Sequence, residues 1–185
     1  MVDLTTTEES PRESLEARIQ LLEDREAIRD LIRRYGLLCD QRRWDDLLEL
    51  YDDDIERQLA GTLDESVRGK EVLRALLEAP ALPRKDPSAP EAPPIDAILE
   101  LDLKHMLSTE LIRISDDGAK ASAHVYYTMV VSRGDAADFE RGVHDGHYEF
   151  TFKKHGDIWR FSRQVVTSNN ATNPLFQMKE PEEAG

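Results

Sequence analysis

Apolar residues in the first third of the chain recur every three or four positions, which is the spacing of one face of an amphipathic helix. The apolar residues of this face are Leu15, Ile19, Leu22, Ile28, Ile32, Tyr35 and Cys39. Asp24 is a candidate cap for a second helical segment, and Gly36 weakens the helix locally. The pattern therefore predicts helical structure from about residue 15 to Asp40.

The next stretch predicts shorter elements. After Asp40, the segment QRRWDDLLELY is typical of a short helix, and the consecutive residues Asp52, Asp53 and Asp54 indicate a turn. A weak strand pattern covers residues 55–59. The segment KEVLRALLEAP then predicts an amphipathic helix that Pro80 stops.

Residues 80–94 contain six of the nine prolines of the chain. This density excludes a helix or a central strand. We expect a semi-rigid surface loop here. The alternative is a lid over a site, because long ordered loops are often functional.

Beyond about residue 100 the pattern is that of strands joined by tight turns. The predicted strands cover residues 105–115, 119–132, 143–154 and 158–166. Two turns, Asp116-Asp117-Gly118 and His155-Gly156-Asp157, contain the glycine that a tight hairpin favours. The third strand alternates cleanly, and its predicted buried face consists of His144, Gly146, Tyr148, Phe150 and Phe152.

Helices followed by a meander of antiparallel strands predict an α+β fold. A strongly curved, mainly antiparallel sheet wrapped around the N-terminal helices would enclose a pocket. The length of 185 residues suits one domain, which we place at residues 14–168. We expect a flexible polar tail at residues 1–13 and a second tail at residues 169–185.

The charge of the chain narrows the range of partners. Lys and Arg number 24 against 38 Asp and Glu, which gives a formal net charge of −14. Because this charge repels phosphate groups, we expect no nucleic-acid partner and no membrane partner. No apolar run approaches the roughly 18 residues of a membrane span, and the N-terminal sequence lacks the pattern of a secretory signal. We therefore expect a cytoplasmic protein.

Two titratable residues are candidates for chemistry. Asp40 ends the predicted helix beside its apolar face, and His105 opens the first long strand. A histidine titrates near neutral pH, and a carboxylate on its Nδ1–H would fix its tautomer and raise its basicity. Spacing alone does not pair them, because 65 residues separate them. Asp40 could equally be a turn residue, and His105 a partly exposed strand end.

The other candidates are less specific. His144 and Tyr148 share the buried face of the third strand, where core packing is the simpler interpretation. The direction of His124 stays open. No metal-ligand motif, phosphate-binding loop or nucleophile elbow occurs, so we expect no metal and no cofactor. Cys39, buried beside Asp40, should have a raised pKa and be a poor nucleophile.

Several segments resemble one family. REAIRDLIRRYGLLCDQRRWDDLLELYDDD is similar to the opening of SnoaL-like proteins in the nuclear transport factor 2-like superfamily, where a helix ends in Asp before a gap, a Trp and an acidic turn. RGKEVLRALL resembles their third helix, and YEFTFKKHGDIWRFSRQ resembles their final hairpin. KHMLSTELIRI resembles the strand opening of scytalone dehydratase and hexachlorocyclohexane dehydrochlorinase. The likeness covers roughly residues 20–168 and implies a cone-shaped α+β barrel.

The resemblance implies a catalytic dyad of Asp40 and His105, because the dehydratase and dehydrochlorinase branch has an Asp and a His at these positions. The sequence also departs from that branch. Cys39 stands in place of a Tyr, and the position of a second catalytic His falls near Val130. A basic residue of the last hairpin falls near Lys154 or His155, in the predicted turn. These departures concern the substrate more than the dyad.

The implied activity is that of a cofactor-independent lyase or isomerase on a small, mostly apolar substrate that contains a ring. His105 would remove a proton from carbon, and Asp40 would orient the His105 ring. Tyr148 or Tyr126, if inward, would donate to the substrate oxygen. The predicted substrate-binding residues are Tyr35, Trp44, Leu107, Tyr126, His144, Tyr148 and Phe150.

Two other functions fit the same fold. A non-catalytic module that binds small ligands would show no contact between Asp40 and His105. An accessory β-type subunit of a ring-hydroxylating dioxygenase would share a large interface with a catalytic subunit. Exposed apolar residues on the convex face of the sheet favour a homo-oligomer, a trimer or a dimer.

Overall fold

The computed structural model describes residues 14–60, 66–78, 102–133 and 140–169. Helices precede most of the strands, as the sequence predicts. Within these ranges the elements are α1 (Leu15–Asp40), α2 (Trp44–Leu48), β1 (Tyr51–Ala60), β2 (Val67–Arg68), α3 (Lys70–Leu77), β3 (Asp102–Ile114), β4 (Lys120–Arg133), β5 (Glu140–His155) and β6 (Ile158–Ser168).

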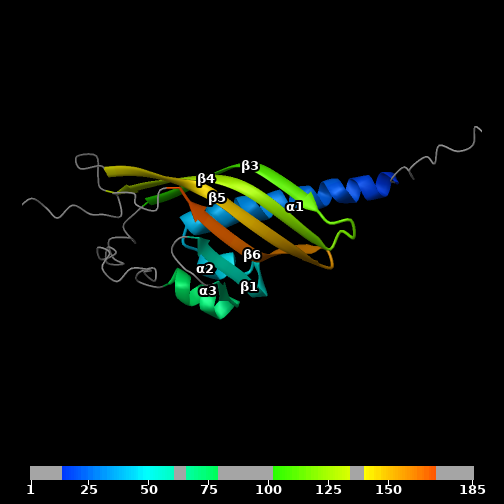
Figure 1. The fold of residues 1–185 in the computed structure, drawn as a ribbon, viewed down its shortest axis with the longest axis horizontal. Coiled ribbons are helices and arrows are strands. Elements are labelled where there is room, and N and C mark those ends of the chain that lie inside the picture. Colours follow the sequence, from blue (N-terminus) through cyan, green and yellow to red (C-terminus); the bar gives the residue numbers. More distant parts are fainter. Residues whose placement is uncertain (1–13, 61–65, 79–101, 134–139, 170–185) are drawn as a thin grey trace, which may run out of the picture.

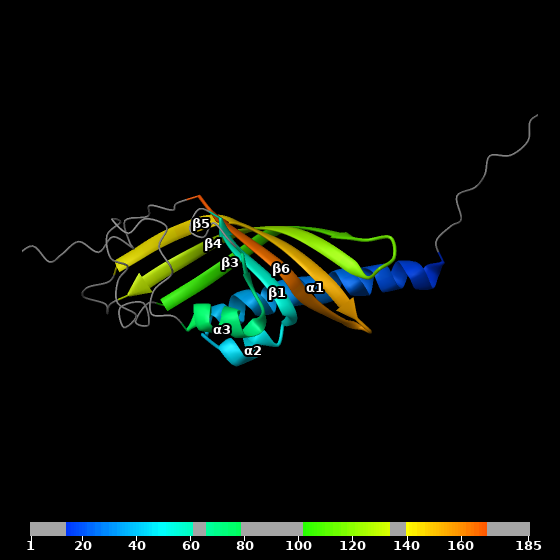
Figure 2. The same cartoon turned by 60° about the horizontal axis from the view of Figure 1, so that its bottom comes forward.

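The strands form one curved, open sheet in the order β2-β1-β6-β5-β4-β3 (Figure 1). Strands β1 and β6 run parallel, and the other neighbouring pairs are antiparallel. Helix α1 lies along one face of the sheet, which we call the inner face (Figure 2). Helices α2 and α3 lie beside β1. The α+β prediction is confirmed. Among the described residues, the structure has no helix that could span a bilayer.

The core lies between α1 and the inner face. Ile28 and Ile32 of α1 are fully buried, as are Phe152 and Phe161 of the sheet. The predicted apolar face of α1 extends too far toward the N-terminus, because Leu15, Ile19 and Leu22 are exposed. The first turns of α1 project beyond the sheet (Figure 1). Leu22 lies on the solvent side of the helix, since its neighbour Leu21 is half-buried and Leu22 is exposed.

Two local predictions are wrong. Asp24 does not cap a second helix, because α1 is continuous and Ser14 caps its start, accepting from the N–H of Ala17. Asp24 instead lies buried against β6 and accepts a hydrogen bond from Trp159 Nε1 over 2.8 Å. Residues 52–54 form part of β1 rather than a turn, because paired basic residues balance their charges.

Strand register confirms the predicted hairpins. The two predicted turns join β3 to β4 and β5 to β6, with positive φ at Gly118 and Gly156. The predicted buried face of β5 is its inner face, where Tyr148, Phe150 and Phe152 are buried. The Pro-rich segment at residues 80–94 lies outside the described residues, as do residues 1–13 and 170–185.

Candidate active site

Asp40 and His105 meet where α1 ends and β3 begins. The Nδ1–H of His105 donates to Asp40 Oδ1 over 2.6 Å, and the backbone N–H of His105 lies 3.0 Å from both carboxylate oxygens. The side chains of Asp40 and His105 are 13% and 8% exposed. A carboxylate only accepts, so Nδ1 holds the proton and Nε2 of His105 holds the lone pair. Nε2 can therefore take a proton, and Asp40 stabilises the imidazolium that results.

A glycine allows α1 to approach β3 at this point. A Cβ at Gly36 would lie 3.1 Å from Leu107 Cδ1 and 3.5 Å from His105 Cβ. The first of these distances is shorter than an ordinary van der Waals contact. The glycine that weakens the helix in the sequence therefore lets the helix bring Asp40 against His105.

Tyr35 connects His105 to the centre of the inner face. The Tyr35 ring lies edge-on to His105, with centroids 6.4 Å apart, and edge-on to Tyr148 at 5.5 Å. Gln164 Nε2 donates to the Tyr35 hydroxyl over 2.9 Å, and the Tyr51 hydroxyl donates to Gln164 Oε1 over 3.1 Å. Burial raises the pKa of all three tyrosines, which keeps them neutral.

His144 lies across the inner face from His105, with Met129 of β4 between them in register. Its Nε2 lies 2.7 Å from Ser168 Oγ, and its Nδ1 lies 3.3 Å from the Tyr127 hydroxyl. Burial lowers the pKa of His144, and the nearby His105 adds to this effect while Asp145 opposes it. His144 is thus a neutral hydrogen-bonding ring near the dyad at neutral pH.

Most predicted substrate-binding residues lie on the inner face or beside it. Leu107 and His144 are half-buried there, whereas Tyr35, Tyr148 and Phe150 are buried. The Phe150 ring packs against Phe161, with centroids 4.8 Å apart, so it forms the floor of this region. Trp44, at the start of α2, is half-buried against the core.

Tyr126 does not face the dyad, so its predicted role is wrong. Its side chain is 51% exposed on the outer face, whereas Tyr127 is buried on the inner face. The two adjacent tyrosines gave the sequence no means of choosing a face. Gly146 pairs in register with Tyr127, and a Cβ at Gly146 would lie 2.9 Å from the Tyr127 ring and closer still to the Thr167 carbonyl oxygen. A missing side chain on β5 thus makes room for Tyr127 beside His144.

Two further residues of the inner face, Gln164 and Arg57, are not predicted from the sequence. Gln164 is fully buried because the register between β5 and β6 shifts between Thr151 and Phe152, which turns it inward. Arg57 pairs in register with Gln164 on the parallel strand β1. Neither has a motif that the sequence could reveal, since a bulge and a strand pairing place them.

The basic residues of the last hairpin lie far from the dyad. Lys154 pairs with Asp24 over 2.7 Å, and Asp24 precedes Asp40 on α1 by sixteen residues, roughly 24 Å along the helix axis. Lys154 therefore fastens the far end of α1 to the sheet.

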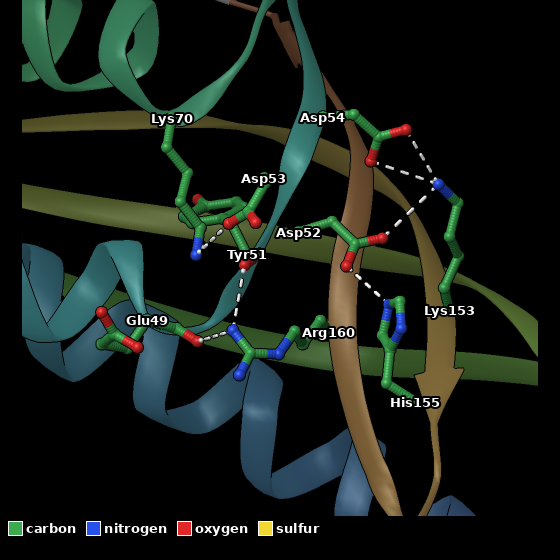
Figure 3. Close-up of polar contacts among 9 residues, drawn as sticks. All are labelled: Glu49, Tyr51, Asp52, Asp53, Asp54, Lys70, Lys153, His155 and Arg160. Carbon is green, nitrogen blue, oxygen red and sulfur yellow. Dashed lines mark hydrogen bonds and ion pairs between the residues drawn. The ribbon is translucent and has the colours of Figure 1, made fainter.

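A second Asp–His pair occurs near the same hairpin (Figure 3). His155 Nε2 lies 2.6 Å from Asp52 Oδ1, but His155 is 54% exposed. Lys153 lies 3.5 Å from Asp52 and 3.1 Å from Asp54, which surrounds the pair with charge. These contacts fasten the β5–β6 hairpin to β1 (Figure 3).

A set of candidate metal ligands spans two strands, so no sequence motif reveals it. His124 of β4 lies opposite Glu149 of β5, and His147 is its diagonal neighbour on the outer face. One ligand atom from each lies within 4.8 Å of the others. Zinc ligands at about 2.1 Å from the metal lie closer together than this. The side chains would need to converge to hold an ion.

The comparisons with known proteins agree with this architecture. Residues 20–165 match the family described as the SnoaL-like domain. The chain belongs to the SnoaL-like domain family. No curated protein matches the sequence significantly.

Solved structures share the fold of this SnoaL-like chain. An NTF2-like protein with a cystatin-like fold from Novosphingobium aromaticivorans is 24% identical, with a TM-score of 0.62, and the match covers 90% of this chain and 99% of that one. A hexachlorocyclohexane dehydrochlorinase is 16% identical, with a TM-score of 0.60, and the match covers 82% of this chain and 89% of that one. A candidate scytalone dehydratase from N. aromaticivorans is 17% identical, with a TM-score of 0.58, and the match covers 82% of this chain and 88% of that one.

Proposed function

We propose that this SnoaL-like protein is a cofactor-independent lyase of the elimination type, or an isomerase, that acts on a small, mostly apolar substrate containing a ring. His105 is the general base, and Asp40 orients it. The observation that carries the proposal is the 2.6 Å contact between His105 Nδ1 and Asp40 Oδ1, which leaves Nε2 available for a proton. Structural neighbours named as a dehydrochlorinase and a candidate scytalone dehydratase support this reaction class.

The proposed step is a proton transfer from carbon. Nε2 of His105 takes the proton, and the electron pair of the broken C–H bond forms a C=C bond or an enolate. In an elimination, the leaving group departs from the neighbouring carbon with its bonding pair. In an isomerisation, the proton returns to a different carbon. A positioned base of this kind accelerates proton transfer by about 10²–10⁴-fold.

The second polar group of the inner face suits the substrate oxygen. Tyr127 and Ser168 surround His144, which is neutral at neutral pH. Hydrogen-bond donors held in place before the reaction stabilise charge that develops on oxygen. We therefore assign this group, in place of Tyr126, to the leaving oxygen or the enolate.

The contact between Asp40 and His105 favours the enzyme over a non-catalytic binding module, because binding alone needs no oriented base. We also propose that one domain spans residues 14–168 and that it self-associates through the outer face. Three of the exposed apolar residues, Met106, Leu111 and Tyr126, lie there on β3 and β4.

Deuterium exchange follows the proton transfer itself, whichever product forms. A panel of cyclic ketones and ring-bearing β-hydroxy ketones is incubated with the protein in D2O, and loss of the C–H signal is followed by NMR. Wild type should exchange the acidic C–H of at least one compound, and His105→Gln should slow this by about 10²–10⁴-fold. His147→Gln, on the outer face, is the matched control. Equal exchange by wild type and His105→Gln would overturn the proposal.

A further inference from the structure

Arg57 brings a cation to the inner face. It lies on β1, in register with Gln164 of the parallel strand β6, and Gln164 is fully buried beneath Tyr35. The ionisable groups that act on its guanidinium are Tyr35, Tyr51, Tyr148 and Cys39. Arg57 thus lies beside the hydrogen-bonded group of Gln164, Tyr35 and Tyr51, and the Tyr35 ring of this group contacts His105.

The guanidinium of Arg57 has no partner in the described part of the chain. Its Nε is buried and makes no hydrogen bond, and no carboxylate of the described residues pairs with it. Other arginines of these strands are satisfied: Arg68 pairs with Glu56 over 2.8 Å, and Arg160 donates to the Glu49 carbonyl over 3.1 Å. A half-buried charge without a partner is unfavourable.

None of its neighbours can supply the missing negative charge. Burial raises the pKa of the three tyrosines beside Arg57 and raises the pKa of the Cys39 thiol to about 12, so all four groups are neutral near pH 7. Asp40, the carboxylate of the proposed dyad, already accepts three contacts from His105. Arginine stays protonated even when buried.

A part of the Arg57 side chain nevertheless remains accessible. The residue as a whole is half-buried, although its Nε is enclosed. This exposed part of the side chain is the place where a ligand would contact Arg57. The unbalanced charge lies in a protein whose net charge is −14, where an acidic residue could easily have neutralised it.

We propose that Arg57 binds an acidic oxygen of the substrate, so that the substrate is a ring compound bearing a phenol, an enol or a carboxylate. This inference rests on the proposed function and narrows its substrate class. A guanidinium donates two parallel hydrogen bonds to a carboxylate, or two converging ones to a single phenolate or enolate oxygen, and the ion pair is strong where water is scarce. An ionised oxygen of the substrate would balance the positive charge of Arg57, which no described residue neutralises.

The test uses 4-nitrophenol, whose phenolate absorbs at a longer wavelength than the phenol. A cation within a few ångström lowers the pKa of a bound acid by about 1–3 units. Wild type, titrated into the probe below the pKa of free 4-nitrophenol, should therefore increase the phenolate absorbance. Arg57→Met should abolish the increase, and Arg57→Lys should retain part of it. Arg68→Met, which removes an exposed arginine, is the matched control and should behave as wild type.

A stability measurement separates loss of a binding site from loss of the fold. Removing an unpaired buried charge should leave the thermal midpoint of Arg57→Met equal to or above that of wild type. A lower midpoint would show that Arg57 has a structural partner and would overturn the proposal. No binding of the probe by wild type, or equal ionisation in wild type and Arg57→Met, would also overturn it.

The Asp40→Asn variant distinguishes this inference from the proposed function. It should ionise the bound probe as wild type does, because Arg57 is unchanged. Deuterium exchange independent of His105 together with normal probe ionisation would refute the general base alone. Exchange that depends on His105, without probe ionisation, would refute the role of Arg57 alone.

Discussion

His105 is attached to Asp40 at two points of its structure, the backbone N–H and the ring Nδ1. The backbone contact fixes the position of β3 relative to the end of α1. The ring contact fixes the rotation of the imidazole and the tautomer. One carboxylate thus joins α1 to β3 and also orients the His105 ring as a base. Substitutions of Asp40 can therefore change the unfolding free energy and the proton transfer rate to different extents.

Asp40→Asn should separate these two roles. The amide oxygen can still accept from the backbone N–H, so we expect a small loss of stability, about 1 kcal/mol. Proton transfer should fall by about 10²-fold or more, because a neutral amide no longer stabilises the imidazolium. Urea unfolding and deuterium exchange measure the two quantities.

Asp40→Ala provides the comparison. It removes every acceptor and leaves the backbone N–H and Nδ1–H of His105 unsatisfied, which should cost about 2–3 kcal/mol more than Asp40→Asn. Equal stability of the two variants would contradict the double attachment.

Gly36→Val should impair the site through packing alone. A Cβ added at Gly36 would already lie 3.1 Å from Leu107 Cδ1, and valine adds two methyl groups to that Cβ. We expect a destabilisation of about 1–3 kcal/mol from overpacking, although glycine is a poor helix former. The proton transfer rate should fall as His105 moves from its place.

Leu107→Ala in the Gly36→Val background should restore part of both losses, since it frees the space that valine needs. Leu37→Val, at the exposed neighbour, is the control and should change the unfolding free energy by less than about 1 kcal/mol. A rate unaffected in Gly36→Val would show that His105 does not depend on this contact.

The periodic parts of the chain predicted their own structure, and the irregular parts did not. The alternation of β5 placed His144 and Tyr148 correctly, because one wet and one dry face enforce a period of two. The same rule failed at Tyr126 and Tyr127, where either residue suits either face. Gln164 faces inward only because of the register shift between β5 and β6, and no local sequence pattern predicts this shift.

The candidate dyad shows the same division. The sequence located Asp40 and His105 through a family resemblance, and the geometry brings them together through a helix approach that Gly36 permits. Arg57 and the Asp52–His155 pair arise from strand pairing between β1 and β6, which are separated by about a hundred residues. Contacts at such separation depend on the whole fold, so composition and spacing could not reveal them.

The outer face should control self-association. Leu111 and Tyr126 are more than half exposed, at 57% and 51%, and lie on adjacent strands. We expect wild type to elute as a dimer or a trimer in gel filtration with light scattering, and Leu111→Glu/Tyr126→Glu to shift it toward the monomer. Leu22→Glu, at an exposed position of α1, is the control and should leave the assembly unchanged. A monomeric wild type would contradict this expectation.

The pairing of Asp24 with Lys154 and Trp159 should make stability depend on acid pH. Burial opposes ionisation of Asp24, but hydrogen bonds from Lys154 and Trp159 prevail and lower its pKa. A carboxyl whose pKa is lower in the folded state binds its proton more readily in the unfolded state. Its contribution is therefore complete above the unfolded pKa of about 3.9 and is lost as the pH falls through the folded pKa.

Urea unfolding of wild type and Asp24→Asn between pH 7 and pH 2.5 measures this contribution. Asn removes the charge, so the variant should be less stable than wild type by about 2 kcal/mol at pH 7, and the difference should shrink below about pH 4. Glu26→Gln is the control for an exposed ion pair, since Glu26 meets Arg33 at the surface, where water and salt screen the charges, and this variant should leave stability almost unchanged. A difference between wild type and Asp24→Asn that stays constant down to pH 2.5 would show that the Asp24 charge does not stabilise the fold, and that its hydrogen bonds alone hold α1 against β6.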